Sequence, residues 1–155
     1  MWKAIRLYES LGRDDKLEET FPLFLKEHPF SPYHLEAWIK FLMLQHRHPE
    51  RYETMKMKKQ AEEILAQYPT FQQRTNLLLF MCELCEKEGK FDEAIRWTDR
   101  IIQDSSSLNI CLPALGRKMS LARLSGDTSL GSSATLIFDR ATQSVTHGIK
   151  SMILK

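Results

Sequence analysis

Residues 77–102 decide the fold, and they read LLLFMCELCEKEGKFDEAIRWTDRII. Apolar residues recur three and four positions apart through the first half of this stretch, and again through the second half after Ala94. That spacing is typical of helices that turn one face toward a core. Residues 88–91, Glu-Gly-Lys-Phe, interrupt the pattern, and glycine adopts the backbone conformations that a tight turn needs. The stretch therefore predicts two helices joined by a tight turn.

The remainder of the chain shows the same helical spacing. Strands would need alternating apolar and polar residues rich in Val, Ile and Thr, yet the chain has a single valine, Val145, and no convincing alternation. We therefore predict an all-α fold. Helices are expected at 1–11, 14–28, 33–46, 50–68, 71–88, 91–104, 107–124 and 131–149. The short connections between them favour antiparallel helix hairpins.

The expected hairpins recur at a nearly constant interval. The residues at equivalent positions of successive hairpins are Leu17, Met57, Ala94 and Ala134, which are 40, 37 and 40 positions apart. The small Ala94 and the glycine before Phe91 resemble the tetratricopeptide repeat (TPR), and the unit 33–69 is similar to the half-a-TPR (HAT) repeat of RNA-processing scaffolds. These resemblances imply a right-handed α-solenoid of about four irregular helix hairpins. The expected repeats are 1–31, 32–70, 71–106 and 107–149, in a single domain 1–155.

Two features depart from a regular repeat. Pro22 falls inside the second expected helix, where proline removes a backbone hydrogen bond, so that helix is expected to be kinked there or to begin near Phe21. The ends of the chain are apolar, at Trp2 and at Met152–Leu154, whereas the ends of a repeat array normally carry polar caps. The chain is therefore expected to form part of a longer solenoid or to have its ends covered by a partner.

The charge and cysteine counts exclude several classes of protein. The 155 residues include 22 Lys and Arg and 20 Asp and Glu, so a net charge of +2 gives no overall signature of nucleic-acid binding. Three cysteines are an odd number, which disfavours a secreted disulfide framework. The first residues have no signal-peptide pattern, and the longest apolar run, Leu77–Cys82, is too short to cross a membrane. We expect a folded protein of a reducing compartment.

No polar cluster in the sequence has the pattern of a catalytic or metal site. Cys82 and Cys85 have the spacing of zinc and redox sites, but further ligands at a suitable spacing are missing, and both fall on the core face of a helix. His46 and His48 belong to an expected turn, and Ser105–Ser107 suits an interhelix loop better than a nucleophile. The sequence predicts no catalytic residue, no metal, no cofactor and no enzymatic activity. A hydrolase or a metal-dependent enzyme is the alternative from another class.

Aromatic and basic side chains are the candidates for contacts with partners. Tyr33 and Trp97 are the candidate partner-binding residues, since Tyr and Trp anchor many interfaces. Segment 46–59 has five basic and two acidic residues, and segment 111–155 has six basic and two acidic residues. The candidate basic contacts are Arg47, Arg51, Lys56, Lys58, Lys59, Arg117 and Lys118. They suit nucleic acid or an acidic partner, although a basic helix face often serves solubility alone.

A second resemblance covers roughly residues 10–115. The stretches that carry it are, in order, Asp15–Glu18, His28–His34, Trp38–Leu42, Ile64–Pro69 and Leu77–Leu84. Together they resemble a repeat of the TATA-binding-protein-associated, A-type component of the RNA polymerase I selectivity (core) factor. In that family a Pro-Asn-Pro-like turn leads to a His and then to an aromatic, Leu-rich helix. Ser31 stands here where the turn of the family has Asn.

This resemblance implies a nuclear, nucleolar scaffold without enzymatic activity. Such a protein gathers the TATA-binding protein and sister subunits of a transcription initiation factor at ribosomal DNA promoters. Its helix pairs would bind partner helices by groove packing, with a weak contact of the basic segments to DNA. The alternative is a HAT- or TPR-type scaffold of an RNA-processing complex, which the unit 33–69 favours. The identity of the partners separates the two hypotheses.

Overall fold

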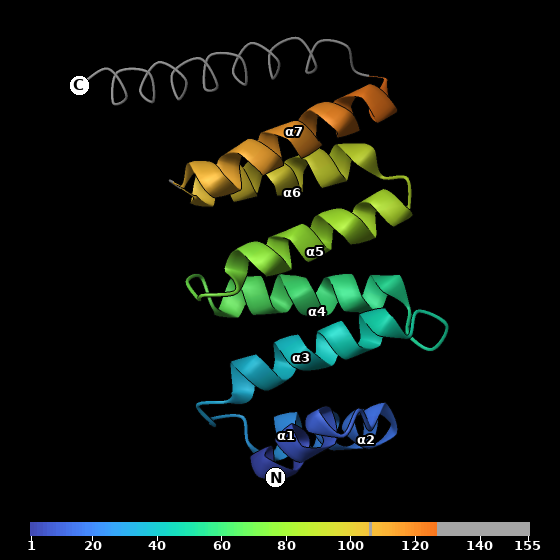
Figure 1. Cartoon of the computed structure of the whole chain (residues 1–155), viewed down its shortest axis with the longest axis vertical. Helices are drawn as coiled ribbons and strands as arrows, with labels where there is room; N and C mark the ends of the chain where they lie inside the picture. The colour runs from blue at the N-terminus through green and yellow to red at the C-terminus, as the bar shows by residue number, and fades with distance from the viewer. Residues whose placement is uncertain (106, 127–155) are drawn as a thin grey trace, which may run out of the picture. The chain divides into compact units, whose positions relative to one another are not determined.

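The computed structural model describes residues 1–105 and 107–126, and these residues form seven α-helices and no strand (Figure 1). The prediction of an all-α protein is confirmed for this part of the chain. The helices are α1 (Trp2–Ser10), α2 (Asp14–Glu27), α3 (His34–Arg47), α4 (Thr54–Gln67), α5 (Arg74–Lys87), α6 (Phe91–Asp104) and α7 (Leu108–Ser125). The helix expected at 131–149, with Ala134, lies outside the described residues.

The helices belong to two compact units, one of residues Met1–Gln72 and one that begins at Gln73. In the first unit α1 packs on α2, α2 on α3 and α3 on α4; in the second α5 packs on α6 and α6 on α7. Within each unit the connections lie alternately at opposite ends, so neighbouring helices run antiparallel (Figure 1). Each unit is thus a series of helix hairpins. The single domain 1–155 stays a prediction.

Proline sets the ends of three helices. His28, His48 and Tyr68 each precede a proline, and each is the first residue after a helix, with φ of −127°, −120° and −121°. A proline ring clashes with helical backbone at the residue before it and pushes that residue toward extended conformations. Because this effect is local, the predicted ends of these helices fall within a residue of the observed ones.

The turns between α1 and α2 and between α5 and α6 are the same turn. Gly12 and Gly89, 77 positions apart, have φ of 63° and 71°, a left-handed conformation that residues with a Cβ rarely adopt. Each glycine N–H donates to the carbonyl three positions earlier, at 3.1 and 2.9 Å, and the next residue donates to the carbonyl five positions earlier, at 2.9 Å in both turns. The following helix begins two residues after the glycine in each case.

The expected register of the hairpins is confirmed in the described residues. Leu17, Met57 and Ala94 are each the fourth residue of their helix, in α2, α4 and α6. All three side chains are buried. Residues that the sequence placed at equivalent positions therefore occupy equivalent positions in the helices.

The buried positions of the first unit recur in the second. The core of the first unit includes Ile5, Leu17, Phe21, Phe24, Ala37 and Leu44. The residues 77 positions later are all buried as well, and they are Cys82, Ala94, Thr98, Ile101, Ala114 and Leu121. In only two of these six pairs, the Ala pair and the Leu44–Leu121 pair, is the residue the same. The two units therefore share a pattern of burial that the residue types themselves largely conceal.

Helix α2 runs through Pro22 without ending there. It begins at Asp14 and continues to Glu27, so the expectation that it begins near Phe21 is wrong. Asp14 and Asp15 lie in its first turn, where negative charge stabilises a helix N-terminus. Pro22 is exposed and has no N–H, so one carbonyl of the preceding turn lacks its helical hydrogen bond.

Candidate partner-binding surface

Tyr33 belongs to an aromatic cluster where α3 begins. Its ring stacks on Trp2 of α1, with centroids 4.9 Å apart and an interplanar angle of 8°. The Lys40 ammonium lies 5.6 Å from the centroid of Trp2 and pairs with Glu9 at 2.7 Å. Tyr33 is nevertheless 45% exposed. This candidate residue is therefore accessible and held in place by α1.

Trp97 is placed quite differently. It lies in α6 with only 8% of its surface exposed, and the guanidinium of Arg100 covers its ring at 5.0 Å from the centroid. A partner could reach only a small part of this side chain. Trp97 is therefore mainly a core residue of α6.

The basic residues of segment 46–59 largely have acidic partners within the first unit. Arg47 pairs with Asp14 at 3.3 Å, Arg51 with Glu18 at 3.0 Å, and Lys56 with Glu53 at 3.2 Å. The first two pairs connect the end of α3 and the turn after it to α2. Lys58 is only 5% exposed, whereas Lys59 is exposed. Most of the local excess of positive charge is thus balanced inside the unit.

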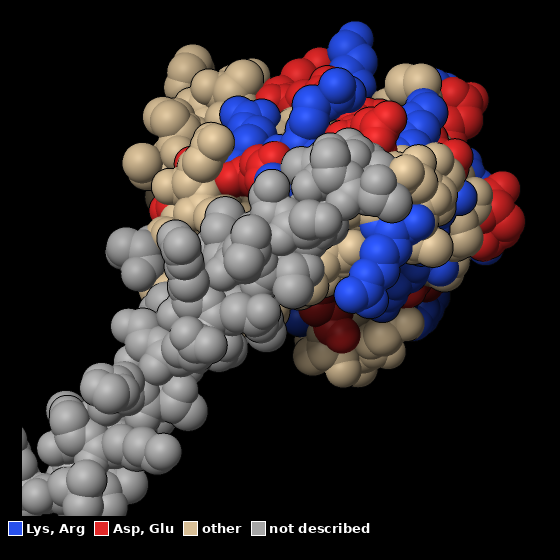
Figure 2. Space-filling view, turned by 90° about the horizontal axis from the view of Figure 1, so that it is seen from above, with Lys and Arg blue, Asp and Glu red and all other residues tan. Residues whose placement is uncertain are grey.

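Arg117 and Lys118 are also paired. The Arg117 guanidinium donates to Glu86 at 2.7 Å, and this hydrogen bond raises the pKa of Arg117. Lys118 pairs with Asp99 at 2.6 Å. The Arg117–Glu86 pair lies 77 positions after the Lys40–Glu9 pair, so an ion pair connects the first and third helices of both units. Where Figure 2 shows described residues, Lys and Arg lie among Asp and Glu.

The cysteines of α5 are core residues, as the sequence predicted. Cys82 and Cys85 are free thiols and buried. Cys82 Sγ donates to the Ala94 carbonyl at 3.6 Å and lies 3.5 Å from the hydroxyl of Thr98. Burial raises the pKa of the Cys82 thiol, with a smaller opposing effect of Thr98. Within the part of the chain that the structure describes, no group of three or more His, Cys, Asp or Glu could hold a metal ion, and no helix is long and apolar enough to cross a membrane.

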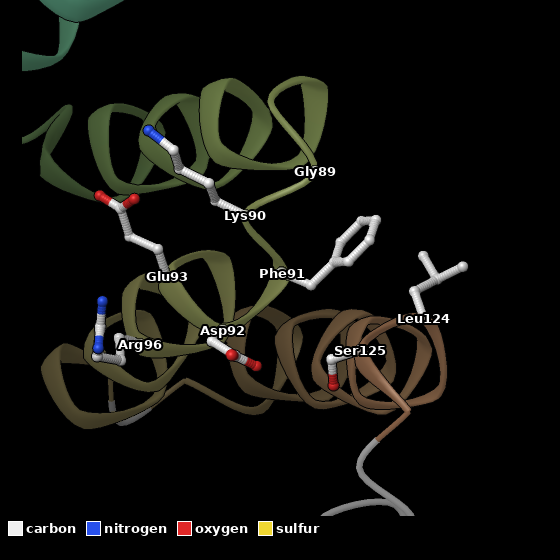
Figure 3. A pocket seen from close by; sticks show the side chains of 8 residues that line it. All are labelled: Gly89, Lys90, Phe91, Asp92, Glu93, Arg96, Leu124 and Ser125. Atoms are coloured by element: carbon white, nitrogen blue, oxygen red, sulfur yellow. The ribbon is translucent and has the colours of Figure 1, made fainter.

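A hollow of about 520 Å³ lies where α6 begins and α7 ends. Figure 3 shows Phe91 and Leu124 on one side of it and charged side chains, including Lys90, on the other. The positions 77 residues before Phe91 and Leu124 are those of Asp14 and Arg47, which form an ion pair. The two units therefore differ at this place. The first unit has an ion pair there, and the second has a hollow bordered by two apolar side chains.

An apolar groove of about 410 Å³ lies between α2, α3 and α4 in the first unit. We call it the α2–α4 groove, and it is lined by Pro22, Leu25, Lys26, His34, Trp38, Phe41 and Gln60. Trp38 meets the edge of His34, with ring centroids 5.8 Å apart, while Phe41 packs on Phe21 at 5.8 Å. Trp38 and Phe41 are half-buried and turn part of their surface to the groove.

Two features of this surface were not predicted from the sequence. One is the α2–α4 groove, and its only sequence signal is a proline retained in the middle of a helix. The other is Phe30, which is 98% exposed three residues before Tyr33. A nearly bare aromatic ring next to a second exposed one suits a contact with another protein.

No protein-family model, no curated protein and no solved structure matches this chain. The function must therefore be inferred from the internal repetition of the chain and from its surfaces.

Proposed function

We propose that this chain is a non-enzymatic helical-repeat scaffold for the assembly of proteins. One observation carries the proposal, the recurrence of the same arrangement after 77 residues. The glycine turn, the six buried positions and the ion pair between the first and third helices all return at that interval. Recurrent helix hairpins are typical of repeat proteins, which present extended surfaces to their partners.

The spacing supports a right-handed α-solenoid of about four TPR- and HAT-like hairpins. Two successive hairpins, of 40 and 37 residues, make up the interval that recurs. The first hairpin has a turn of residues 11–13, whereas the second has the longer turn 48–53. A tetratricopeptide hairpin has about 34 residues, and longer turns are a feature in which HAT repeats differ from it. An alternation of the two kinds of hairpin accounts for both intervals.

Within this class we propose a component of an RNA polymerase I transcription initiation factor. Such a protein works in the nucleus and nucleolus, with the TATA-binding protein and sister subunits as partners at ribosomal DNA promoters. The support is the resemblance along residues 10–115, in which the turn His28–His34 carries the two exposed rings of Phe30 and Tyr33. Because Arg47, Arg51, Arg117 and Lys118 are paired with carboxylates, we propose proteins and not nucleic acid as the main partners.

The second candidate is a scaffold of an RNA-processing complex. The turn 48–53 favours it, because the hairpin of α3 and α4 is then closer to a HAT repeat than to a tetratricopeptide. Both candidates require the same kind of fold and the same absence of catalysis. They differ in the proteins that the chain assembles.

Purification of the tagged full chain from nuclear extract, at two salt concentrations and with mass spectrometry of the bound proteins, tests the proposal. Recovery of the TATA-binding protein with polymerase I initiation subunits is the expected result. Recovery of splicing or exosome proteins would replace it with the second candidate. If the tagged chain is purified without any partner at both salt concentrations, the proposed scaffold function is refuted.

A further inference from the structure

The α2–α4 groove is the place where the first unit departs most clearly from the repeated arrangement. Pro22 of α2 and Phe41 of α3 line it. The residues 77 positions later are Asp99 of α6 and Lys118 of α7, whose side chains form an ion pair at 2.6 Å. Where the second unit closes the space between two helices with opposite charges, the first unit has two apolar rings and a groove.

The two places share one contact between a side chain and the backbone. At the start of α3, His34 Nδ1 lies 3.2 Å from the carbonyl oxygen of His28. At the matching positions of the second unit, the Cys111 thiol donates to the Ser105 carbonyl at the same distance, 3.2 Å. The backbone there differs between the units, because α3 begins at His34, whereas α7 begins at Leu108, three positions before the matching Cys111. The first unit thus differs from the second in the side chains of α2 and α3 and in the loop before α3, and the counterpart of Gln60 lies outside the described residues.

Pro22 disfavours the helix that contains it. Proline removes one helical hydrogen bond and crowds the preceding turn, yet α2 continues past it to Glu27. Residues that break a local rule without a local gain are typical of functional sites. The Pro22 ring adds apolar surface to the groove. An aspartate, such as Asp99 at the matching position of α6, would not add it.

The polar groups at the groove define the chemistry of an occupant. The exposed Lys26 lines the groove and has no ion-pair partner among the described residues of the chain. The Oε1 atom of Gln60, on the opposite side, is buried and accepts no hydrogen bond in the described part of the structure. An occupant that brings a carboxylate and an N–H donor would complement both groups.

The composition of the groove distinguishes between kinds of ligand. A small metabolite needs several convergent polar groups for its orientation, and a nucleic acid needs a series of free cations along its backbone. Among the residues described here, the groove has one free cation and four apolar side chains, Pro22, Leu25, Trp38 and Phe41. A surface of this kind, open between helices, suits the apolar ridge of another helix.

We propose that the α2–α4 groove binds an amphipathic helix of a partner protein. The helix inserts a Leu or aromatic anchor beside Trp38 and Leu25, and a carboxylate next to the anchor pairs with Lys26. This inference rests on the scaffold function proposed above and names one of its contact surfaces together with the chemistry of the partner segment.

The test uses a phage-displayed library of single-helix peptides, selected on the full chain. The enriched peptides are expected to combine an apolar anchor with a nearby Asp or Glu. Lys26→Glu and Leu25→Ala are expected to weaken binding of the selected peptide about tenfold or more. Lys3→Glu and Leu23→Ala are the matched controls, since Lys3 is exposed in the same unit and Leu23 is exposed on the same helix outside the groove. They should bind as the unchanged chain does.

Several results would overturn the proposal. No enrichment, a basic consensus, or a peptide that binds all four variants equally would each exclude the groove as the site. A circular dichroism spectrum of each variant shows whether the fold is kept, and Lys26→Glu changes an exposed side chain only. In the purification from extract, a Lys26→Glu chain that recovers every partner of the unchanged chain refutes the groove and leaves the scaffold function standing. An unchanged chain that recovers nothing refutes the scaffold function instead.

Discussion

At the scale of single residues, Ala94 shows how tightly the α5–α6 hairpin is packed. It is fully buried, and its carbonyl oxygen accepts hydrogen bonds from Thr98 at 2.9 Å and from the Cys82 thiol at 3.6 Å. A tryptophan there would have to displace its neighbours. We predict that Ala94→Trp lowers the free energy of unfolding by about 1–3 kcal/mol, measured by chemical denaturation.

Ala66→Trp serves as the control for this prediction. Ala66 is exposed near the end of α4, so the same added volume meets solvent, and a change within about 0.5 kcal/mol is expected. If Ala94→Trp were as stable as Ala66→Trp, the hairpin would not be packed around Ala94.

The three cysteines are expected to differ in reactivity. Cys82 and Cys85 are buried, whereas Cys111 is half-buried. Since the thiolate is the reactive form, burial and a raised pKa both protect Cys82. An alkylating reagent should label Cys111 of the native protein first, and peptide mass spectrometry identifies the labelled site. In denaturant all three should react; labelling of native Cys82 as fast as Cys111 would contradict the buried site.

The pKa of Cys82 also has a consequence for stability. A thiol whose pKa is raised by folding keeps its proton more firmly in the native state than in the unfolded chain. Its contribution to stability is therefore complete below the pKa of the unfolded thiol. It is lost as the pH rises through the raised pKa of the folded protein, so the native state should weaken on the alkaline side.

At the scale of elements, glycine has two opposite roles in this chain. Gly89 turns the chain with a φ of 71°, whereas Gly116 lies within α7, and a Cβ added at either would touch nothing within 4 Å. Only the backbone conformation therefore differs. We predict that Gly89→Ala destabilises by about 1–2 kcal/mol and that Gly116→Ala stabilises by about 0.5–1 kcal/mol, as measured by thermal unfolding. Equal effects of the two changes would contradict the turn.

Pro22 gives a second prediction at this scale. Pro22→Ala restores an N–H to the middle of α2 and removes the crowding of the preceding turn, so the free energy of unfolding should rise, by up to about 3 kcal/mol. The same change removes an apolar wall of the α2–α4 groove. Denaturation of the variant measures the gain. A loss of stability would mean that the proline ring contributes more through packing than it removes from the helix.

The elements could be predicted from the sequence, because their determinants are local. Prolines after His28, His48 and Tyr68 end helices by a clash with the residue before them. Gly12 and Gly89 mark turns because glycine, without a Cβ, readily adopts the left-handed conformation that these turns need. The equivalence of Leu17, Met57 and Ala94 followed from counting residues, although the helix expected at 50–68 begins only at Thr54. Pro22 misled the prediction because packing with the neighbouring helices outweighs its low helix propensity.

The candidate site could be predicted only in part. The basic segment 46–59 was visible in the sequence, but its partners Asp14 and Glu18 lie more than thirty positions away. The α2–α4 groove joins residues from Pro22 to Gln60 on three helices, and no local pattern reports such a meeting. The exposure of Phe30 could not be predicted either, since the exposure of an aromatic residue is a property of the folded surface and not of the local sequence.

At the scale of the whole molecule, the two units share one arrangement and differ in the surfaces they leave open. The first unit has a groove at Pro22 and Phe41 where the second has the pair Asp99–Lys118. At the other end the roles reverse, with Asp14 and Arg47 paired where Phe91 and Leu124 border a hollow. A shared framework with different open surfaces is what a scaffold needs to hold several partners at once.

The function proposed for this chain requires it to work as part of an assembly. Size-exclusion chromatography of freshly prepared nuclear extract, with detection of the tagged full chain by immunoblot, tests this most directly. A scaffold bound to its partners should elute far above the 18.2 kDa of the chain, and it should move to smaller size when the complexes are dissociated by denaturant. Elution of all the chain at its own mass, in extract that keeps other nuclear complexes intact, would refute the scaffold function.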